Sequence, residues 1–319
     1  MKHLFIINPA AGGIGKHLDQ IRGKIDSFFT DADEPYEIYI TQAPMDAVEK
    51  IRREADRSQE LLRVYACGGD GTLNECVNGA ALRSNVQVCP YPVGTGNDFV
   101  KTFGKDAAAC FTDLEQVTTA SFYAADLIRC NDRWCVNICS VGIDARIGTD
   151  VHKYSHLPLI GGAAGYVTSL VVNIAKGINQ TYTVRCGEYE KTGLFSLICA
   201  CNGTHYGGGF NPVPEASPFD GEINFLVVGQ VSRLSFLRLV GKYAAGKYRQ
   251  MRRYISALHG DHMTIEAESP IVVNVDGEAL YARKIDLTLH PCALQLVVPA
   301  SLQPWRRLTG IAPTAAAQE

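Results

Sequence analysis

The chain has 319 residues, of which 46% are hydrophobic and 20% are charged, as expected for a globular protein of one large or two ordinary domains. Its formal net charge of -3 excludes a protein that binds nucleic acid through overall positive charge. The eleven cysteines are odd in number and include no C-x-x-C pair, which argues against a disulfide framework or a structural zinc site and favours a reduced, cytoplasmic setting.

The first 120 residues or so alternate between apolar strands and helices. We predict strands over residues 2–8, 36–41, 61–67 and 86–93. We predict helices over residues 15–29, 43–56, 72–82 and 98–103. Near-continuous apolar strands that alternate with helices are typical of a parallel sheet with helices on both faces. The first part of the chain is therefore predicted to be an α/β domain.

From about residue 121 the pattern changes to strands separated by short turns, with helices only near 166–176 and 232–250. The predicted strands cover residues 122–130, 133–142, 182–186, 194–203, 223–229, 262–267, 271–278, 285–290 and 293–298. This pattern predicts an all-β, antiparallel, sandwich-like domain. We place the α/β domain at 1–122 and the β-sandwich domain at 123–295, with the C-terminal segment 296–312 returning to the first domain.

Neither a signal peptide nor a membrane span is predicted. The N-terminus, "MKHLFIINPAAGG", has no long apolar core followed by a small-residue cleavage site. The most apolar stretch, residues 159–177, is interrupted by glycines, Asn173 and Lys176, which indicates a buried or surface-lying helix. The expected location is the cytoplasm.

Three glycine-rich segments follow three of the predicted parallel strands: "NPAAGG" (8–13), "GGDGTLNE" (68–75) and "PVGTGNDF" (92–99). Parallel strands present their carboxyl ends at one edge of the sheet, so the three loops are expected to lie together. Glycine lets backbone amides approach a phosphate, and a helix N-terminus adds positive charge. Asp70 beside a phosphate would need a divalent cation between them. Each segment alone could be a plain turn, but together they predict a nucleotide-phosphate site that uses Mg²⁺.

Two common nucleotide-binding motifs do not fit these loops. A Walker A motif would need glycine at Ala10 and serine or threonine at His17. A Rossmann fingerprint would need glycine at Phe99, three residues after Gly96.

In this order and spacing, the three segments resemble the catalytic domain of the diacylglycerol kinases. They are closest to the soluble bacterial lipid kinases of that superfamily, which is related to sphingosine and ceramide kinases. The segments at 201–225 and 273–278 ("VNVDGE") match later motifs, so the resemblance extends over nearly the whole chain. "GGDGT" alone also occurs in NAD kinases and phosphofructokinases, whereas its combination with "GTGNDF" and "VDGE" is specific. The resemblance implies that the first domain has the NAD kinase/phosphofructokinase-like fold.

The resemblance further implies ATP and Mg²⁺ as cofactors, with the nucleotide between the two domains. The implied ATP contacts are Asn8, Pro9, Ala10, Ala11, Gly12, Thr41, Gly68, Gly69, Asp70, Gly71, Thr72, Leu73, Asn74, Glu75, Thr95, Gly96 and Asn97. Thr41 depends on the family pattern alone, because a threonine after a strand is more often a helix cap. The implied metal-binding residues are Asp70, Asp98 and Asp220 for the catalytic ion, partly through waters, and Ser217, Asp220 and Glu222 for a structural ion.

The "VDGE" motif carries the implied base. Phosphoryl transfer to an alcohol needs a carboxylate that accepts the hydroxyl proton. We favour Glu278, with Asp276 essential beside it and Asp70 as the third catalytic residue. Two acids two positions apart would share one face of a strand, but Gly277 between them suggests a bend.

The sequence therefore predicts an ATP-dependent lipid kinase with diacylglycerol as the default acceptor. An NAD kinase-like phosphotransferase and a catalytically silent lipid-binding protein are the alternatives. The lipid partner would be met at a membrane surface, with peripheral contact through the basic, tyrosine-rich segment 241–254, although an ordinary solvated helix face explains that segment equally well. No nucleic-acid partner is expected, and a homodimer is left open.

Overall fold

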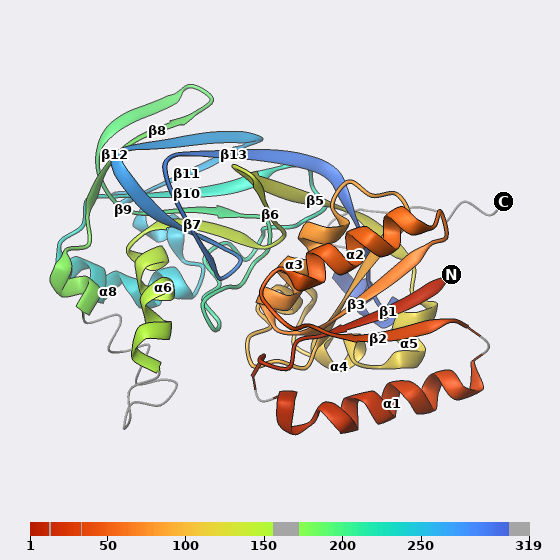
Figure 1. The fold of residues 1–319 in the computed structure, drawn as a ribbon. Helices are drawn as coiled ribbons and strands as arrows, with labels where there is room; N and C mark the ends of the chain where they lie inside the picture. Colours follow the sequence, from red (N-terminus) through yellow and green to blue (C-terminus); the bar gives the residue numbers. More distant parts are fainter. Residues whose placement is uncertain (13, 33, 156–171, 306–319) are drawn as a thin grey trace. The chain divides into compact units, whose positions relative to one another are not determined.

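The structure is a computed structural model that describes residues 1–12, 14–32, 34–155 and 172–305 (Figure 1). The chain divides into two compact units. Unit 1 consists of Met1–Leu127 and the segment from His290 onward, and unit 2 consists of Ile128–Leu289.

Unit 1 is built on parallel strands. Strands β1 (Lys2–Ile7), β2 (Tyr36–Ile40), β3 (Leu62–Gly68) and β4 (Val86–Pro92) lie in the order β4-β3-β1-β2, and every pairing is parallel. The end of β13 (Glu278–Val297) adds a further parallel pairing to β4. Strands β1, β3 and β4 are almost completely buried, as expected when both faces of a sheet are covered.

Helices and 3-10 turns connect these strands. The helices are α1 (Leu18–Asp31), α2 (Asp46–Arg57), α3 (Asp70–Ala80), α4 (Ala107–Phe111) and α5 (Leu114–Thr119). The predicted helix at 98–103 is the 3-10 turn η2 (Phe99–Phe103), and further 3-10 turns are η1 (Ile14–Lys16) and η4 (Ala300–Trp305). Helices α4 and α5 are not predicted from the sequence, because they are too short to give a periodic apolar pattern.

The strands of unit 2 pair in antiparallel fashion. They are β5 (Phe122–Cys130), which begins in unit 1, β6 (Arg133–Cys135), β7 (Ile138–Gly142), β8 (Gln180–Cys186), β9 (Tyr189–Cys201), β10 (Ile223–Gly229), β11 (Ile255–Gly260), β12 (His262–Val275) and the first part of β13. The order is β11-β10-β9-β7-β12-β13, and β8 pairs with both β9 and β12. The two long strands β9 and β12 therefore pair with β7 along one part and with β8 along another.

Several predicted strands of unit 2 have different limits in the structure. The pairs predicted at 262–267 and 271–278, and at 285–290 and 293–298, are the continuous strands β12 and β13, and the run at 133–142 is divided into β6 and β7. The register of β12 against β13 shifts between Glu266 and Ile271, so the polar residues there form an irregularity rather than a turn. Strand β11 is not predicted from the sequence, because only Ile255 among its six residues is buried and the strand lacks the apolar pattern of an internal strand.

Unit 2 has two apolar cores, on opposite faces of its strands. One core gathers residues from β7, β8, β9, β10, β12 and β13, including Tyr182, Phe195 and Phe225. The other packs alternate residues of β7, β9 and β10 against α6 (Ile143–Ser155), α8 (Arg233–Ala244) and the 3-10 turn η3 (Tyr248–Met251). Alternation along a strand sends neighbouring side chains to opposite faces, which explains how Cys199 and Ala200 belong to different cores.

The predicted helix at 166–176 and the apolar stretch 159–177 lie largely outside the described residues. The part of the predicted helix that the structure describes, residues 172–176, is helical. Within the described chain, no helix has the length and apolar character needed to cross a bilayer.

Candidate functional site

The three glycine loops of unit 1 come together at the carboxyl ends of the parallel strands. Register explains why: Ile7 is level with Cys67 and Ile40, and Gly68 is level with Pro92, so the strands end side by side. The loops at 8–12, 68–71 and 93–97 therefore begin at one edge of the sheet, as the sequence predicted for a shared site.

Glycine is needed here because the loops meet backbone to backbone. A Cβ on Gly69 would lie 2.6 Å from the carbonyl oxygen of Gly96, and a Cβ on Gly94 would lie 2.7 Å from the nitrogen of Gly69. Gly12, with φ of +47°, would bring a Cβ to 2.6 Å from the nitrogen of Thr95. Any side chain at these positions would force the loops apart.

Asp70 joins the second loop to the third. Its amide donates to the carbonyl of Gly96 at 2.9 Å. Its carboxylate accepts the amides of Asp98 at 2.9 Å and of Phe99 at 3.2 Å. The Asp98 side chain makes no capping hydrogen bond to the 3-10 turn η2 that follows it. It accepts instead from Lys101 Nζ at 2.5 Å, an ion pair that the sequence analysis missed although the two residues stand three apart.

Other predicted contact residues shape the loops. Asn8 Oδ1 accepts the amide of Ala10 at 3.0 Å, which folds Pro9, Ala10 and Ala11 into a turn. Asn97 Nδ2 donates to the carbonyl of Gly94 at 2.7 Å. The Thr41 amide donates to the carbonyl of Ile7 at 2.9 Å, so Thr41 lies beside the end of β1 and not at the cap of α2, which is Met45.

The remaining residues of "GGDGTLNE" form the first turns of α3. Thr72, Leu73 and Asn74 are buried, and Asn74 Oδ1 accepts Asn78 Nδ2 at 3.1 Å. These side chains therefore belong to the packed side of the helix, whereas Gly71 and Glu75 are half-buried. The buried Thr72 hydroxyl has no hydrogen-bond partner among the described residues. It lies against Gly68, where a Cβ would come within 2.1 Å of it.

In unit 2, Asp276 and Gly277 form the two-residue turn between β12 and β13. Their φ angles are +50° and +99°, the left-handed values that a type I′ hairpin requires. The Gly277 amide donates to Asn274 Oδ1 at 2.7 Å, and Val275 is paired with Glu278 across the turn. Asp276 therefore lies within the hairpin turn and Glu278 directly after it, so the two acids of the motif do not share a strand face.

The environments of these two acids differ. Asp276 is only 7% exposed, and its carboxylate accepts the amides of Val136 at 2.8 Å, Asn137 at 3.0 Å and Ile138 at 3.0 Å. The Cys135 thiol donates to it at 2.9 Å. Asp276 thus fixes the connection between β6 and β7, whereas the neighbouring Glu278 is exposed.

The three residues implied for a structural metal ion lie in the segment before β10. Ser217 is buried, and its hydroxyl has no hydrogen-bond partner among the described residues. Asp220 and Glu222 are exposed; Asp220 Oδ1 accepts the Glu222 amide at 3.1 Å, and the Glu222 carboxylate lies 3.7 Å from His259 Nδ1. In the part of the chain that the structure describes, no three His, Cys, Asp or Glu side chains form a metal-binding group.

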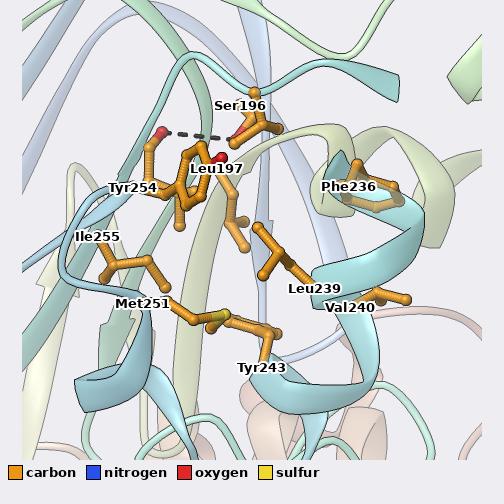
Figure 2. Close-up of a pocket in the computed structure, with 11 residues that line it drawn as sticks. Ser196, Leu197, Phe236, Leu239, Val240, Tyr243, Met251, Tyr254 and Ile255 are labelled. Atoms are coloured by element: carbon orange, nitrogen blue, oxygen red, sulfur yellow. Dashed lines mark hydrogen bonds between the residues drawn. The ribbon is translucent and has the colours of Figure 1, made fainter. Parts of the chain in front are cut away.

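An apolar cavity of about 50 Å³ lies between α8, η3 and the strands β9 and β10 (Figure 2). Phe236, Leu239, Val240 and Tyr243 line it from the helix. Figure 2 shows Leu239 and Tyr243 near Met251 and Ile255. Its walls are almost entirely hydrocarbon, as in a site for an apolar group.

A buried polar cluster behind this cavity was missed by the sequence analysis. The Tyr243 hydroxyl lies 3.1 Å from Cys199 Sγ and 3.1 Å from the Tyr206 hydroxyl. Ser140 Oγ donates to the Asp144 carboxylate at 2.7 Å. Burial raises the pKa of Asp144 to about 6, although hydrogen bonds from Ser140 and Tyr206 oppose the shift. A lone acid in the apolar run "SVGIDARIG" was the available signal.

Comparisons with known proteins match both parts of the chain. Residues 2–130 match the diacylglycerol kinase catalytic domain, and residues 137–298 match the YegS C-terminal NAD kinase beta sandwich-like domain. A Staphylococcus haemolyticus protein named "Putative lipid kinase SH2167" is 27% identical over 250 residues, covering 78% of this chain and 80% of the relative. A Staphylococcus aureus protein named "Putative lipid kinase SAR0780" is 23% identical over 290 residues, covering 88% and 92%.

The fold is also that of a solved structure. The crystal structure titled as a putative diacylglycerol kinase from Bacillus anthracis superposes with a TM-score of 0.71 at 23% identity, covering 94% of this chain and 96% of that one. The two domain matches identify the chain as a member of the diacylglycerol kinase-like lipid kinase family, with a catalytic domain followed by a β-sandwich-like domain.

Proposed function

We propose that the protein is an ATP-dependent lipid kinase that transfers the γ-phosphoryl group of ATP to a lipid hydroxyl, with diacylglycerol as the default acceptor. The observation that carries this proposal is the meeting of three glycine loops at the carboxyl ends of parallel strands. Loops without side chains in the way allow a polyphosphate to lie close to backbone amides, and α3 begins at Asp70 in the same place.

In this proposal the loop residues bind the phosphates and Asp70 keeps the loops in position. Asp70 accepts two amides of the third loop, so its substitution would disturb the site even without a direct contact to the nucleotide. Mg²⁺, when bound, would neutralise phosphate charge. Since Asp70 and Asp98 already accept hydrogen bonds from the chain, we expect them to hold this ion through water. The Ser217 hydroxyl, which has no hydrogen-bond partner in the part of the chain that the structure describes, fits a second ion held with Asp220 and Glu222.

Glu278 is the proposed general base. A base must accept a proton from the acceptor hydroxyl, which requires a carboxylate that substrate can reach. Asp276 is buried and accepts three amides and a thiol, whereas Glu278 is exposed directly after the turn. This contrast supports assigning proton transfer to Glu278 and an organising role to Asp276.

We further propose that the acceptor is taken from a membrane surface by a protein that works in the cytoplasm. The eleven cysteines, all free thiols, are compatible with a reducing compartment. The apolar cavity of unit 2 offers space for part of a lipid chain.

A transfer assay tests the proposed reaction. Purified protein, Mg²⁺ and γ-labelled ATP would be incubated with mixed micelles of a bacterial lipid extract, and labelled products would be identified by mass spectrometry. One dominant phosphorylated lipid is expected. If no lipid is labelled, NAD would be supplied as the acceptor, and its labelling would favour the NAD kinase alternative. ATP binding with no labelled product from lipid or NAD would indicate a silent lipid-binding protein.

A further inference from the structure

We propose that the outward face of α8, with Leu234 and Leu237 at its centre, is the surface through which the protein docks on an anionic lipid bilayer. The inference deepens the proposed function, since a lipid kinase must reach its acceptor in a membrane. It stands on the exposure and charge of unit 2 alone, and a binding measurement can test it without any phosphoryl transfer.

Both faces of α8 carry large apolar side chains, which is unusual for a helix on a protein surface. Its inner face packs Phe236, Leu239 and Tyr243 around the cavity. On the outer face, Leu234 is 56% exposed and Leu237 is 54% exposed. The inner face is sufficient to anchor the helix, so the outer leucines contribute little to folding.

Exposed apolar residues are concentrated in this region. Six large hydrophobic side chains are exposed in the described chain, and Leu194, Leu234 and Leu237 are three of them. Leu194 and Leu234 line the same groove, together with Asn179 and Gln230. A clustered apolar patch on a surface marks an interaction site, whereas a single exposed leucine would not.

Charge identifies the partner as an anionic surface. Residues 231–254 contain no Asp or Glu but have seven basic residues: Arg233, Arg238, Lys242, Lys247, Arg249, Arg252 and Arg253. Arg238 follows Leu237 and stands four residues after Leu234, so it lies on the same helix face. Lys242 continues that face by one further turn. Leucines flanked by cations fit the boundary between anionic headgroups and acyl chains.

The structure also changes which part of the segment carries the contact. The sequence predicts a contact through residues 241–254, with tyrosines among the cations. Tyr243 and Tyr248 are buried, and Arg249 pairs with Glu215 at 2.6 Å. Arg233 donates to the carbonyls of Ile174 and Ala175, both at 2.9 Å. Among the described residues, no acidic side chain pairs with Arg238, Lys242, Lys247 or Arg252. These four cations are therefore available to interact with anionic headgroups.

Sedimentation with vesicles, without ATP, tests the inference. The wild type should bind vesicles of equal phosphatidylglycerol and phosphatidylcholine roughly 600-fold more tightly than phosphatidylcholine alone, since each of the four cations near an anionic surface contributes about fivefold. Leu234→Ser with Leu237→Ser should weaken binding to the anionic vesicles about tenfold. Replacing Arg238, Lys242, Lys247 and Arg252 by Gln should remove most of the preference for phosphatidylglycerol.

Leu82→Ser is the matched control, because Leu82 is 66% exposed and lies in unit 1. It should bind vesicles as the wild type does. Unchanged vesicle binding in both the leucine and the basic variants would overturn the proposal. So would a loss of self-association in the leucine variant, seen by light scattering, since the patch would then be an interface between copies of this chain.

The proposed reaction is tested separately with a short-chain, water-soluble diacylglycerol. The leucine variant should phosphorylate this acceptor at the wild-type rate and vesicle-embedded diacylglycerol about tenfold more slowly. Vesicle binding without phosphorylation of either acceptor would contradict the kinase and leave the docking surface intact.

Discussion

In unit 1, the loops that follow β1, β3 and β4 meet through backbone atoms, whereas in unit 2 the turn between β12 and β13 is held to the β6–β7 connection through the Asp276 carboxylate. The first arrangement depends on the absence of side chains at Gly12, Gly69 and Gly94. The second depends on a charged side chain with 7% exposure. The glycine loops of unit 1 are therefore sensitive to any substitution that adds a side chain. The turn of unit 2 is sensitive to any substitution that removes a hydrogen-bond acceptor from Asp276.

The hairpin itself contains a sharper form of this contrast. Asp276 and Glu278 belong to one motif, yet the first is enclosed by donors and the second is exposed. Two acids of one motif can therefore have different roles: Asp276 accepts hydrogen bonds from the backbone, and Glu278 is accessible for proton transfer. Substitutions that leave shape unchanged can separate the two roles.

The largest expected effect is on turnover in Glu278→Gln. Loss of a general base should lower kcat by about 10³-fold. The free energy of unfolding should change by less than about 0.5 kcal/mol, because the side chain is exposed. The transfer assay and urea unfolding together measure the two quantities. Retained turnover in Glu278→Gln would remove Glu278 from proton transfer and return the role to Asp276.

Asp276→Asn should mainly affect stability. Asparagine keeps the left-handed turn conformation but replaces one accepting oxygen with a donor that faces backbone amides. We expect a loss of about 3 kcal/mol in the free energy of unfolding, as for other buried charged hydrogen-bond acceptors. Asp132→Asn, at an exposed carboxylate, is the matched control and should change stability little. An equally stable Asp276→Asn protein would contradict the anchoring role.

The same contrast explains what could be predicted from sequence. The glycine loops were predictable because their requirement is local: a glycine after each of several parallel strands places bare backbone at one sheet edge. The partners of Asp276 were not, since Val136 to Ile138 are about 140 residues away in the chain. Strand limits failed where a long strand is irregular, as in β12 between Glu266 and Ile271. The exposed leucines of α8 could not be distinguished from its buried ones by composition.

Gly69→Ala tests the backbone contact of unit 1. Gly69 has φ of -104°, which alanine adopts easily, so the obstacle is the Gly96 carbonyl oxygen 2.6 Å from the new Cβ. We expect a loss of about 2 kcal/mol in stability and weaker ATP binding, measured by urea unfolding and titration calorimetry.

Gly23→Ala is the control for that substitution. Gly23 lies within α1 and a Cβ there meets nothing within 4 Å, so alanine should stabilise the protein by about 0.5–1 kcal/mol. Equal effects of the two substitutions would mean that the loops do not need close backbone contact.

A smaller effect than that of Gly69→Ala is expected at Asp144, a carboxylate of unit 2 that accepts from hydroxyls rather than from amides. Burial raises its pKa from 3.8 to about 6 in the folded protein. Between these values the folded state binds more protons than the unfolded state, so its contribution to stability is complete below about pH 4 and is lost as pH rises to about 6. Because Asp144 is half-buried, we expect a loss of about 1–2 kcal/mol in the free energy of unfolding across this window.

Asp144→Asn should abolish this dependence of stability on pH. Urea unfolding of the wild type and of Asp144→Asn from pH 4 to pH 7 measures how the free energy of unfolding depends on pH. If the two proteins show the same dependence, the Asp144 carboxylate has the same free energy of ionisation in the folded chain as in water, unlike an acid enclosed in an apolar core.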